Sequence, residues 1–565
     1  MHLTNRLGVL QQPFESTRAN HLKRRTVKRL CDKDPTVWSA TTDVIEDILN
    51  RLGWIEAPVT FRPRLDDLRD WASVSRAQGL RRVVVLGMGG SSLAPEVFAN
   101  LWPDAALRLD VLDNTAAPAV RRAWQQSPPD QTMYIVSSKS GSTAETLAFF
   151  EYFHAQAVAA LGTEANRHFV AITDAGSALE QLAAEHDFQK VFLNPVDIGG
   201  RFSALSYFGL VPAALLNIDL SRLLDSAEHE MQRCADPNSA AAELGYALGT
   251  AIKMGRDKLM LVMSETLRPL SVWIEQLIAE SLGKQGMGSV PVCAEPTIGA
   301  TGNLDDRFYV QLDSGSMEPA MQALYQQLVD AGCPVMRRSV FNRYDLGREY
   351  FTWEFATAIA AAVLQLNPFD EPDVAVSKTM TRSVLDGMQV IERPADDNSG
   401  TALTPNANHP LFARCGDAAS YLRELLNSVQ TGDYFALLAF LPVTASLEHF
   451  LRAHARDLAK HLGCVVSTGI GPRYLHSTGQ LHKGGANNGV FLLLSADTDD
   501  DIDIPGQHYT FGQLNQAQAC GDFKVLQTRH RRVLRMHLGV QVERNLERLT
   551  ELINAELLSR QSATI

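Results

Sequence analysis

The sequence is poor in the features that mark secreted, membrane and nucleic-acid-binding proteins. Its seven cysteines are scattered and include no C-x-x-C pair, which argues against a disulfide framework and for free thiols in a reducing compartment. Lysine and arginine are outnumbered by aspartate and glutamate, 52 to 64, so broad nucleic-acid binding is not expected. The first residues lack the apolar core of a signal peptide, and no uncharged apolar run approaches the roughly 18 residues of a membrane span. We therefore expect a cytoplasmic protein without nucleic-acid or membrane partners.

An alternation of strand-like and helix-like segments makes up most of what is present. From Arg81 onward, runs such as RVVVLG, TMYIVSS and HFVAITD are separated by apolar helical stretches such as AETLAFFEYFHAQAVAAL. Buried strands that alternate with helices predict a parallel sheet covered on both faces. A second set of strands starts at KLMLVMS, and a third group (YFALLAFL, CVVSTG and GVFLLLS) follows a turn-rich segment at 388–410.

The predicted fold class is therefore α/β, with two αβα sandwich domains built on parallel sheets. The chain of 565 residues is long enough for two or three domains with buried cores. We expect the C-terminal region to complete the second sandwich or to extend it. The predicted boundaries are a helical N-terminal arm at 1–75, the first sandwich at 76–250, the second at 251–390 and an α/β region at 400–565.

A basic run, HLKRRTVKRL, occupies residues 21–30 of the predicted arm. Charge runs of this kind usually lie on a solvated helix face, and we expect the same of this one. An acidic protein can still hold an anion, but it must do so locally, with backbone N–H groups and a few cations.

A glycine- and serine-rich loop, GMGGSS at 87–92, follows the first buried strand. The dinucleotide fingerprint G-x-G-x-x-G needs a third glycine where this chain has Ser92, although Asp113 stands where a ribose-binding acid would be expected. Gly89 and Gly90 still allow the backbone to approach a ligand closely, and the N-terminus of the following helix favours an anion. The loop alone leaves a structural turn and an anion site both open.

A second loop, SSKSGST at 137–143, also connects a strand to a helix. Ser142 and Glu145 have the spacing of a capping box and predict where the helix starts. Hydroxyls, backbone N–H groups and Lys139 together suit a phosphate monoester dianion. A dinucleotide-binding fold has no need of such a loop on its third strand, so the two loops together favour a phosphorylated ligand.

Five motifs, in the same order along residues 85–380, resemble those of the phosphoglucose isomerase family. They are GMGGSSLAPEVF, SSKSGSTAET, DIGGRFSALSYFGLVPAALL, EQLIAESLGKQG and LQLNPFDEPDVAVSK. The C-terminal stretch GPRYLHSTGQLHKGGANNG is similar to the isomerase half of bifunctional transaldolase/phosphoglucose isomerases. No transaldolase portion precedes it, so transaldolase activity is not expected. The resemblance implies that both sandwiches are sugar-isomerase (SIS) domains.

The resemblance further implies reversible conversion of D-glucose 6-phosphate into D-fructose 6-phosphate through an enediolate, with no cofactor and no metal. Glu280 would move the proton between C2 and C1, because one carboxylate can take it and return it. Arg201 would stabilise the enediolate anion, and Lys378 would assist ring opening. Gln276 lies one helical turn before Glu280 and shares its face. The expected substrate-binding residues are Gly90, Ser91, Ser138, Lys139, Ser140, Ser142, Thr143, Gly200 and Gln276.

The family's ring-opening histidine, in a GTNGQHAFY-like stretch, has no counterpart between the glutamate and lysine motifs. This chain reads ATGNLDDRFYVQL there, with Asp306 in the histidine's place. Either Asp306 replaces the histidine, or His476 or His482 does, since these two flank a T-G-Q similar to the missing motif. An imidazole near neutral pKa suits proton exchange with the ring oxygen. Each histidine is also open to a buried structural role, and Lys483 with the two glycines after it to an anion site; the spacing disfavours zinc.

Three other functions compete with this one. A related isomerase would also accept mannose 6-phosphate. A non-catalytic sugar-phosphate sensor would keep the serine loops but would be free to lose the acid and base groups, so Glu280, Arg201 and Lys378 argue against it. A nicotinamide-dependent dehydrogenase is disfavoured by Ser92 and by the second loop. Because members of the family are commonly dimers that share active-site residues, a homo-oligomer, most simply a dimer, is expected.

Overall fold

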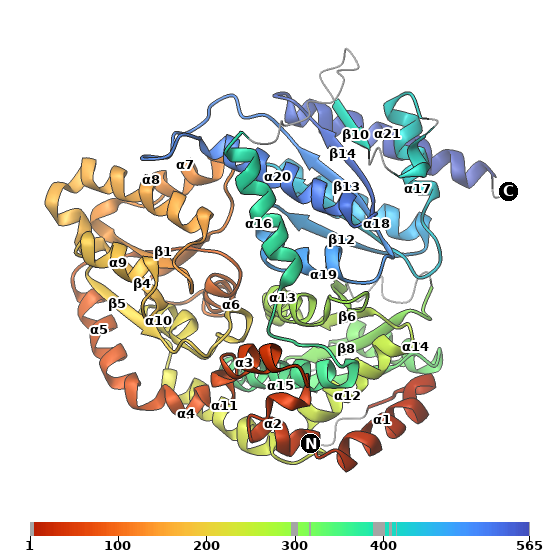
Figure 1. Cartoon of the computed structure of the whole chain (residues 1–565), viewed down its shortest axis with the longest axis horizontal. Helices are drawn as coiled ribbons and strands as arrows, with labels where there is room; N and C mark the ends of the chain where they lie inside the picture. Colours follow the sequence, from red (N-terminus) through yellow and green to blue (C-terminus); the bar gives the residue numbers. More distant parts are fainter. Residues whose placement is uncertain are drawn as a thin grey trace. The chain divides into compact units, whose positions relative to one another are not determined.

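The computed structural model describes residues 5–294, 303–315, 318–387, 402–405, 409–413 and 415–563 (Figure 1). As predicted, they form an α/β fold with largely parallel sheets. The chain divides into two compact units. The described residues of Met1–Asp113, Ala123–Ala300 and Asp305–Asp370 make up the first, and those of Asn114–Arg122, Thr301–Leu304 and Glu371–Ile565 the second. Among the described helices, none is both long enough and apolar enough to cross a membrane.

Short helices of the N-terminal segment belong to the core of the first unit. Trp54 and Phe61 are fully buried, and the Trp54 ring lies 5.1 Å from that of Phe202, centroid to centroid. The segment predicted as an arm therefore contributes side chains to the same apolar core as the sheets. Its helices are α1 (Gln11–Lys23), α2 (Thr26–Cys31), α3 (Thr42–Leu49), α4 (Ala57–Thr60) and α5 (Leu65–Ala77).

The first sheet is parallel throughout, in the order β2-β1-β3-β4-β5. Every residue of β1 and β3 is buried, as expected for central strands covered on both faces. The two predicted ligand loops follow β1 and β3, and so lie at the carboxyl edge of the sheet, where ligands of α/β proteins bind. The strands are β1 (Arg82–Gly87), β2 (Arg108–Leu112), β3 (Thr132–Ser137), β4 (Phe169–Asp174) and β5 (Lys190–Asn194), and the helices α6 (Leu93–Leu101), α7 (Ala117–Gln125), α8 (Ala144–Leu161), α9 (Ala178–Glu185), α10 (Tyr207–Leu215), α11 (Leu220–Cys234) and α12 (Ala240–Lys253).

The second sheet, also in the first unit, is parallel with the order β7-β6-β8-β9. Its central helix, α15, is buried at every position except Arg348, as expected of an apolar helix in a protein interior. The neighbouring helix α13 packs against α15 and against the turns η5 (Gly89–Ser91) and η8 (Gly200–Phe202) of the first sheet. The elements are β6 (Lys258–Met263), β7 (Val290–Ala294), β8 (Arg307–Asp313), β9 (Val335–Ser339), α13 (Leu270–Leu282), α14 (Pro319–Asp330) and α15 (Leu346–Leu364).

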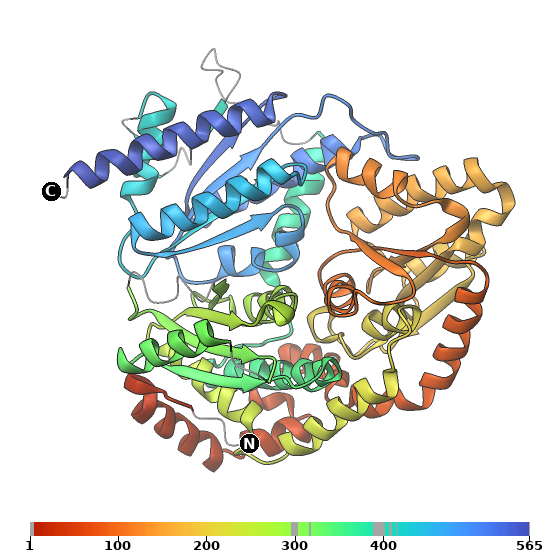
Figure 2. The same ribbon diagram turned by 180° about the vertical axis from the view of Figure 1, so that it is seen from behind.

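The third sheet, in the second unit, has the order β10-β14-β13-β11-β12, with only β10 antiparallel to its neighbour. In Figure 1, α16 and α20 lie on one face of this sheet, and in Figure 2, which shows the other face, α18 and α21 cross it. The elements are β10 (Ala402–Pro405), β11 (Tyr434–Phe440), β12 (Val465–Ile470), β13 (Gly489–Ser495), β14 (Arg532–His537), α16 (Pro372–Leu385), α17 (Ala418–Asn427), α18 (Ala445–Leu462), α19 (Gly479–Gly484), α20 (Phe511–Thr528) and α21 (Val542–Ala563).

The units differ from the predicted domains in two respects. The first two sheets share one apolar core, whereas the third sheet has its own core and adds no strand to the second sheet among the described residues. The helix α16, predicted within 251–390, belongs to the second unit, where Val384 packs against Ala517 and Cys520 of α20. The apolar face of a helix predicts that the helix packs against another element, but the pattern does not specify which element that is.

Candidate active site

The glycines of the first loop are needed for loop packing. A Cβ on Gly90 would lie 2.0 Å from the carbonyl oxygen of Gly200, so only glycine permits this approach of η5 to η8. The Ser203 hydroxyl links the two turns, because it donates to the Gly200 carbonyl at 2.6 Å and to the Gly90 carbonyl at 3.4 Å. Ser91 is buried beside them. A Cβ on Gly200, in contrast, would meet no atom within 4 Å, so Gly200 is the glycine that borders open space.

The serine loop after β3 holds its hydroxyls in pairs. The Ser140 and Ser142 hydroxyl oxygens lie 2.9 Å apart, and those of Ser138 and Thr143 lie 3.0 Å apart. The predicted capping box is wrong: Thr143 is the N-cap of α8 and its side chain makes no capping bond. The reason is that Ser142 uses its hydroxyl on Ser140 instead of on the helix. Ser140 and Ser142 are exposed, so this pair is accessible to a ligand at the start of α8.

Lys139, predicted to bind phosphate, is held by protein partners. Its ammonium group pairs with the Asp174 carboxylate at the end of β4 and donates to the Val196 carbonyl at 2.8 Å. Burial raises the pKa of Asp174, and the charge of Lys139 opposes that rise. The charge of Lys139 is therefore balanced by Asp174. The donors that this loop offers to an anion are the serine hydroxyls and the first N–H groups of α8.

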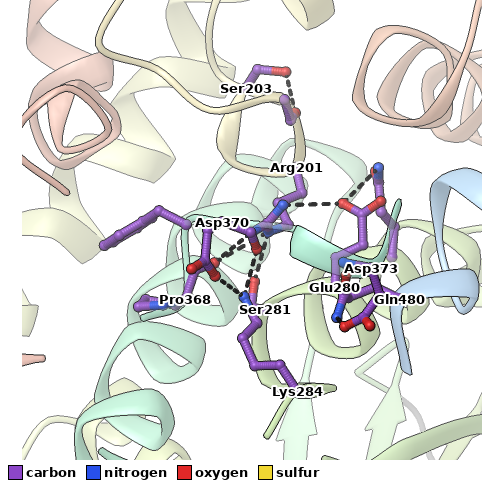
Figure 3. A network of polar contacts seen from close by, with 12 residues as sticks. Arg201, Ser203, Glu280, Ser281, Lys284, Pro368, Asp370, Asp373 and Gln480 are labelled. Atoms are coloured by element: carbon purple, nitrogen blue, oxygen red, sulfur yellow. Dashed lines mark hydrogen bonds and ion pairs between the residues drawn. The ribbon is translucent and has the colours of Figure 1, made fainter. Parts of the chain in front are cut away.

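Glu280 lies in the last turns of α13 and is the centre of a buried polar cluster (Figure 3). Its side chain is 8% exposed. The carboxylate oxygen Oε2 accepts from Arg201 Nη1 at 3.3 Å and from Gln276 Nε2 at 3.3 Å. The structure thus brings together three residues that the motifs singled out, and Gln276 shares the helix face of Glu280 as its spacing predicts.

Arg201 is fixed mainly by carbonyl groups (Figure 3). Its Nη2 donates to the carbonyls of Pro368 at 2.7 Å and Asp370 at 2.8 Å, and its Nε donates to the Ser281 hydroxyl at 3.0 Å. Carbonyl dipoles orient a guanidinium without cancelling its charge. Arg201 therefore keeps a positive charge at the face that it turns to Glu280.

Lys284 supports the same cluster and was not singled out from the sequence. It is 2% exposed, and its ammonium group donates to the carbonyls of Asn367 at 2.9 Å and Asp370 at 2.5 Å and to the Asp370 carboxylate at 2.6 Å. Lys284 and Arg201 thus bind the same short segment, 367–370. The signal was present as the final lysine of the E-S-x-G-K motif, but the motif gives no role for it.

In the second unit, Lys378 is exposed on α16 and makes no hydrogen bond or ion pair with any described residue. The first turn of its helix is held by Gln480, from the T-G-Q segment. Gln480 accepts from the backbone N–H of Asp373 at 3.0 Å and donates to the Asp373 carboxylate at 2.8 Å, as Figure 3 shows. Arg529 pairs with the same carboxylate. Gln480 was not predicted as a functional residue, and it acts by positioning α16.

The two candidate histidines have different surroundings. His476 ends the turn η12 (Arg473–His476) and is half-buried. His482 is 2% exposed, and its Nδ1 lies 2.9 Å from the Tyr434 hydroxyl. Burial, together with the charges of Lys483 and Arg531, lowers the pKa of His482 to about 3. His482 is therefore a neutral, packed ring at physiological pH, as in the structural interpretation that the sequence left open.

Lys483 and Asp306, the remaining candidates, are both engaged in buried ion pairs. Lys483 lies 2.6 Å from the Asp522 carboxylate, and both side chains are 1% exposed. Asp306, just before β8, lies 3.7 Å from the ammonium group of Lys258, and burial raises its pKa. The stretch 295–302 that precedes it lies outside the described residues. Within the described residues, no three His, Cys, Asp or Glu side chains are grouped as metal ligands.

Similarity to known proteins identifies the family of the chain. The family model described as phosphoglucose isomerase matches residues 10–296. Glucose-6-phosphate isomerases of Thermus thermophilus and Rubrobacter xylanophilus are each 29% identical, over 60% and 63% of this chain and 90% and 93% of their own length.

Two solved structures are similar as well. A hypothetical protein of Thermus thermophilus is 25% identical, with a TM-score of 0.59 over 68% of this chain and 100% of its own. A glucose-6-phosphate isomerase from Chlamydia trachomatis shares the fold at 17% identity, with a TM-score of 0.53 over 67% of this chain and 86% of its own. Because the family model matches half of this chain, the chain belongs to the phosphoglucose isomerase family.

Proposed function

We propose that the protein interconverts D-glucose 6-phosphate and D-fructose 6-phosphate. Its relatives are named for this activity. The observation that carries the proposal is the buried Glu280 carboxylate, which accepts from both Arg201 and Gln276. A carboxylate with a fixed cation on one side is what proton transfer through an anionic enediolate requires.

In the forward direction, Glu280 removes the proton from C2 of the open-chain aldose, and the electron pair moves to the carbonyl oxygen at C1. The resulting enediolate is an anion, and Arg201 stabilises it without moving, because carbonyl and hydroxyl partners already fix the guanidinium. Glu280 then returns the proton to C1, and the hydroxyl proton on the C2 oxygen is transferred to the C1 oxygen, which leaves the ketose carbonyl at C2 and a hydroxyl at C1. No electron acceptor is required, since the oxidation at C2 balances the reduction at C1.

We assign substrate binding to the loops at the carboxyl edge of the first sheet. The exposed hydroxyls of Ser140 and Ser142 and the first N–H groups of α8 suit the phosphate group. The open space at Gly200 suits the sugar. The other members of this proposed set are Gly90, Ser91, Ser138, Lys139, Thr143 and Gln276, with Lys139 positioned by Asp174.

Ring opening is assigned to Lys378 and His476. Lys378 is exposed with a free ammonium group among the described residues, and His476 is half-buried. The buried, neutral His482 supports His476 as the acid and base, because a group with a pKa of about 3 is a poor proton carrier near neutral pH. The variant His476→Ala should slow turnover of ring-closed substrate more than that of open-chain substrate. Equal losses on both would contradict the assignment.

The central test is conversion of glucose 6-phosphate to fructose 6-phosphate by the native protein and by Glu280→Gln. The amide keeps the size of the side chain and removes the base, so kcat should fall by about 10²–10⁴-fold. Glu275→Gln, a change of the same chemistry on the half-buried neighbour in α13, is the matched control and should keep its activity. Equal rates for native protein and Glu280→Gln would refute the role of Glu280.

The same assay separates the competing functions. A sensor would bind glucose 6-phosphate without converting it, and an isomerase of broader specificity would also turn over mannose 6-phosphate. We further expect a dimer, which sedimentation would detect as twice the 62.1 kDa mass of the chain, and a cytoplasmic location, consistent with the seven free cysteines.

A further inference from the structure

A pocket of about 370 Å³ lies in the first unit, and its lining residues are well separated in sequence from the serine loop. Its walls are the turn between α1 and α2, the segment after α2 and the last turn of α15. Sites for small molecules have volumes of about 300–1,000 Å³, so a metabolite-sized ligand fits. The lining includes part of the basic run 21–30, which the proposed isomerase activity does not use.

The His21 ring is the buried polar group of this pocket. The residue is 7% exposed and lines the pocket wall. Its Nδ1 lies 2.9 Å from the Thr26 hydroxyl, while its Nε2 has no hydrogen-bond partner among the described residues. Nε2 is not among the buried unsatisfied atoms of the described residues, so it is accessible in the pocket wall. An imidazole nitrogen that is open in the wall of a pocket is available to a ligand.

The charges around His21 are positive and incompletely balanced. Arg24 lines the pocket and makes no side-chain hydrogen bond or ion pair within the described part of the chain. Arg29, also in the wall, is paired with Asp34 at 2.7 Å. Burial and the charges of Arg24 and Lys253 lower the pKa of His21 to about 4. Of the side chains that face the ring from α12, Lys253 adds positive charge, and Tyr246, at 5.7 Å between ring centroids, is neutral with a pKa raised to about 12.

We propose that this pocket binds a small phosphorylated metabolite, with its phosphate group at Arg24 and His21 and its organic part against Trp38. A guanidinium with open N–H groups is suited to phosphate oxygens. The Ser39 hydroxyl, in the same wall, accepts from the Thr41 N–H at 3.1 Å and is free to donate. Trp38 lines the pocket and contributes only apolar atoms to it, because its indole N–H is already bonded to the Ala358 carbonyl at 2.9 Å.

The test follows the ring resonances of the histidines by NMR while inorganic phosphate is added at constant ionic strength. The variant His21→Gln identifies the His21 signal by its loss. The His21 resonance should move and saturate with phosphate, and its pKa should rise from about 4, because a nearby anion favours the charged imidazolium. Constant ionic strength removes the contribution of general screening.

Three variants localise the response. Arg24→Gln should weaken the phosphate response of His21 by about tenfold or more, because it removes the open guanidinium. Lys23→Gln removes the same charge from an exposed position of α1 outside the pocket, and should leave the response unchanged. Ser140→Ala with Ser142→Ala alters the proposed substrate loop and should also leave it unchanged. No movement of His21 in the native protein, or an undiminished response in Arg24→Gln, would overturn the proposal.

Discussion

Two buried charged clusters, one in each unit, use similar groups in different ways. Glu280 and Arg201 lie 3.3 Å apart with side chains 8% and 5% exposed. Lys483 and Asp522 lie 2.6 Å apart, both 1% exposed, and the Tyr474 hydroxyl donates to the second oxygen of Asp522 at 2.6 Å. The Lys483–Asp522 pair is therefore the shorter of the two, and its carboxylate has a second partner in Tyr474.

The difference lies in what satisfies the charges. Arg201 is oriented by neutral carbonyl and hydroxyl groups and faces the Glu280 carboxylate at 3.3 Å. Lys483 has a full counter-ion in Asp522 and also donates to the Gly479 carbonyl at 3.1 Å. A buried ion pair that is closed in this way holds elements of a fold together, whereas one held by dipoles is prepared for chemistry.

Breaking the closed pair should have the largest effect on stability. Lys483→Met leaves Asp522 as a buried, uncompensated carboxylate and should lower the free energy of unfolding by about 3–5 kcal/mol. Urea unfolding followed by circular dichroism would measure the loss. The double variant Lys483→Met with Asp522→Leu should recover most of it, because no buried charge then remains. A loss below about 1 kcal/mol in the single variant would show that the pair is not structural.

A change in the residues that position Arg201 should affect catalysis. Lys284→Met removes the ammonium group that binds segment 367–370, whose carbonyls orient Arg201. A displacement of about 1 Å at a catalytic group costs about 10²-fold in rate, so kcat should fall by that order while KM changes little. Steady-state kinetics on protein checked for folding by circular dichroism would test this. A rise in KM with unchanged kcat would instead indicate that Lys284 affects substrate binding alone.

Gly90, which is closely packed, and Gly200, which borders open space, allow a finer comparison. Gly90→Ala places a Cβ 2.0 Å from the Gly200 carbonyl oxygen, and such overpacking should cost about 1–3 kcal/mol of stability. Gly200→Ala meets no atom within 4 Å, so its stability should change by less than about 0.5 kcal/mol, while KM for the sugar phosphate should rise. Thermal unfolding and kinetics of the two variants would distinguish them, and equal destabilisation would contradict the geometry.

The protonation of His482, next to Lys483 in the second unit, should make stability depend on pH. The pKa of His482 falls from its ordinary value of 6.5 to about 3 on folding. Below about pH 6.5 the unfolded chain therefore binds a proton at His482, whereas the folded protein binds it only below about pH 3. The free energy of unfolding consequently decreases as the pH falls through this window. His482→Gln should reduce the difference in urea midpoint between about pH 7 and about pH 4.5. An unchanged difference would mean that other groups, such as His21 with its pKa of about 4, carry the pH dependence.

Much of the fold and the centre of the candidate site were predictable because they rest on local patterns. The strands β1, β3 and β4 are short apolar runs between turns, and helical spacing alone places Gln276 and Glu280 on one face. The strand β14 was missed because arginines interrupt its apolar pattern. Arg532 is paired with Asp433 at 2.7 Å, and Arg535 donates to the Ser495 hydroxyl at 3.1 Å, so the buried strand tolerates these charges.

What could not be predicted depends on contacts between distant segments. The carbonyls that hold Arg201 come from residues 167 and 169 positions later in the chain, and no local pattern encodes such a pairing. The same is true of Lys284 and of the approach of Gly90 to Gly200. The capping box failed for a local reason, because Ser142 had a competing hydroxyl partner in Ser140.

The anchoring of Arg201 by carbonyl groups has a consequence for behaviour in salt. Bonds between a buried cation and neutral dipoles are little affected by mobile ions, which mainly screen exposed charges. The proposed phosphate site at Ser140 and Ser142 is, in contrast, exposed, and its attraction for the phosphate charge comes from the N-terminus of α8, which salt screens. Raising the ionic strength should therefore weaken capture of the sugar phosphate and leave the rate of the bound complex almost constant, so that a change of medium alone separates binding from proton transfer.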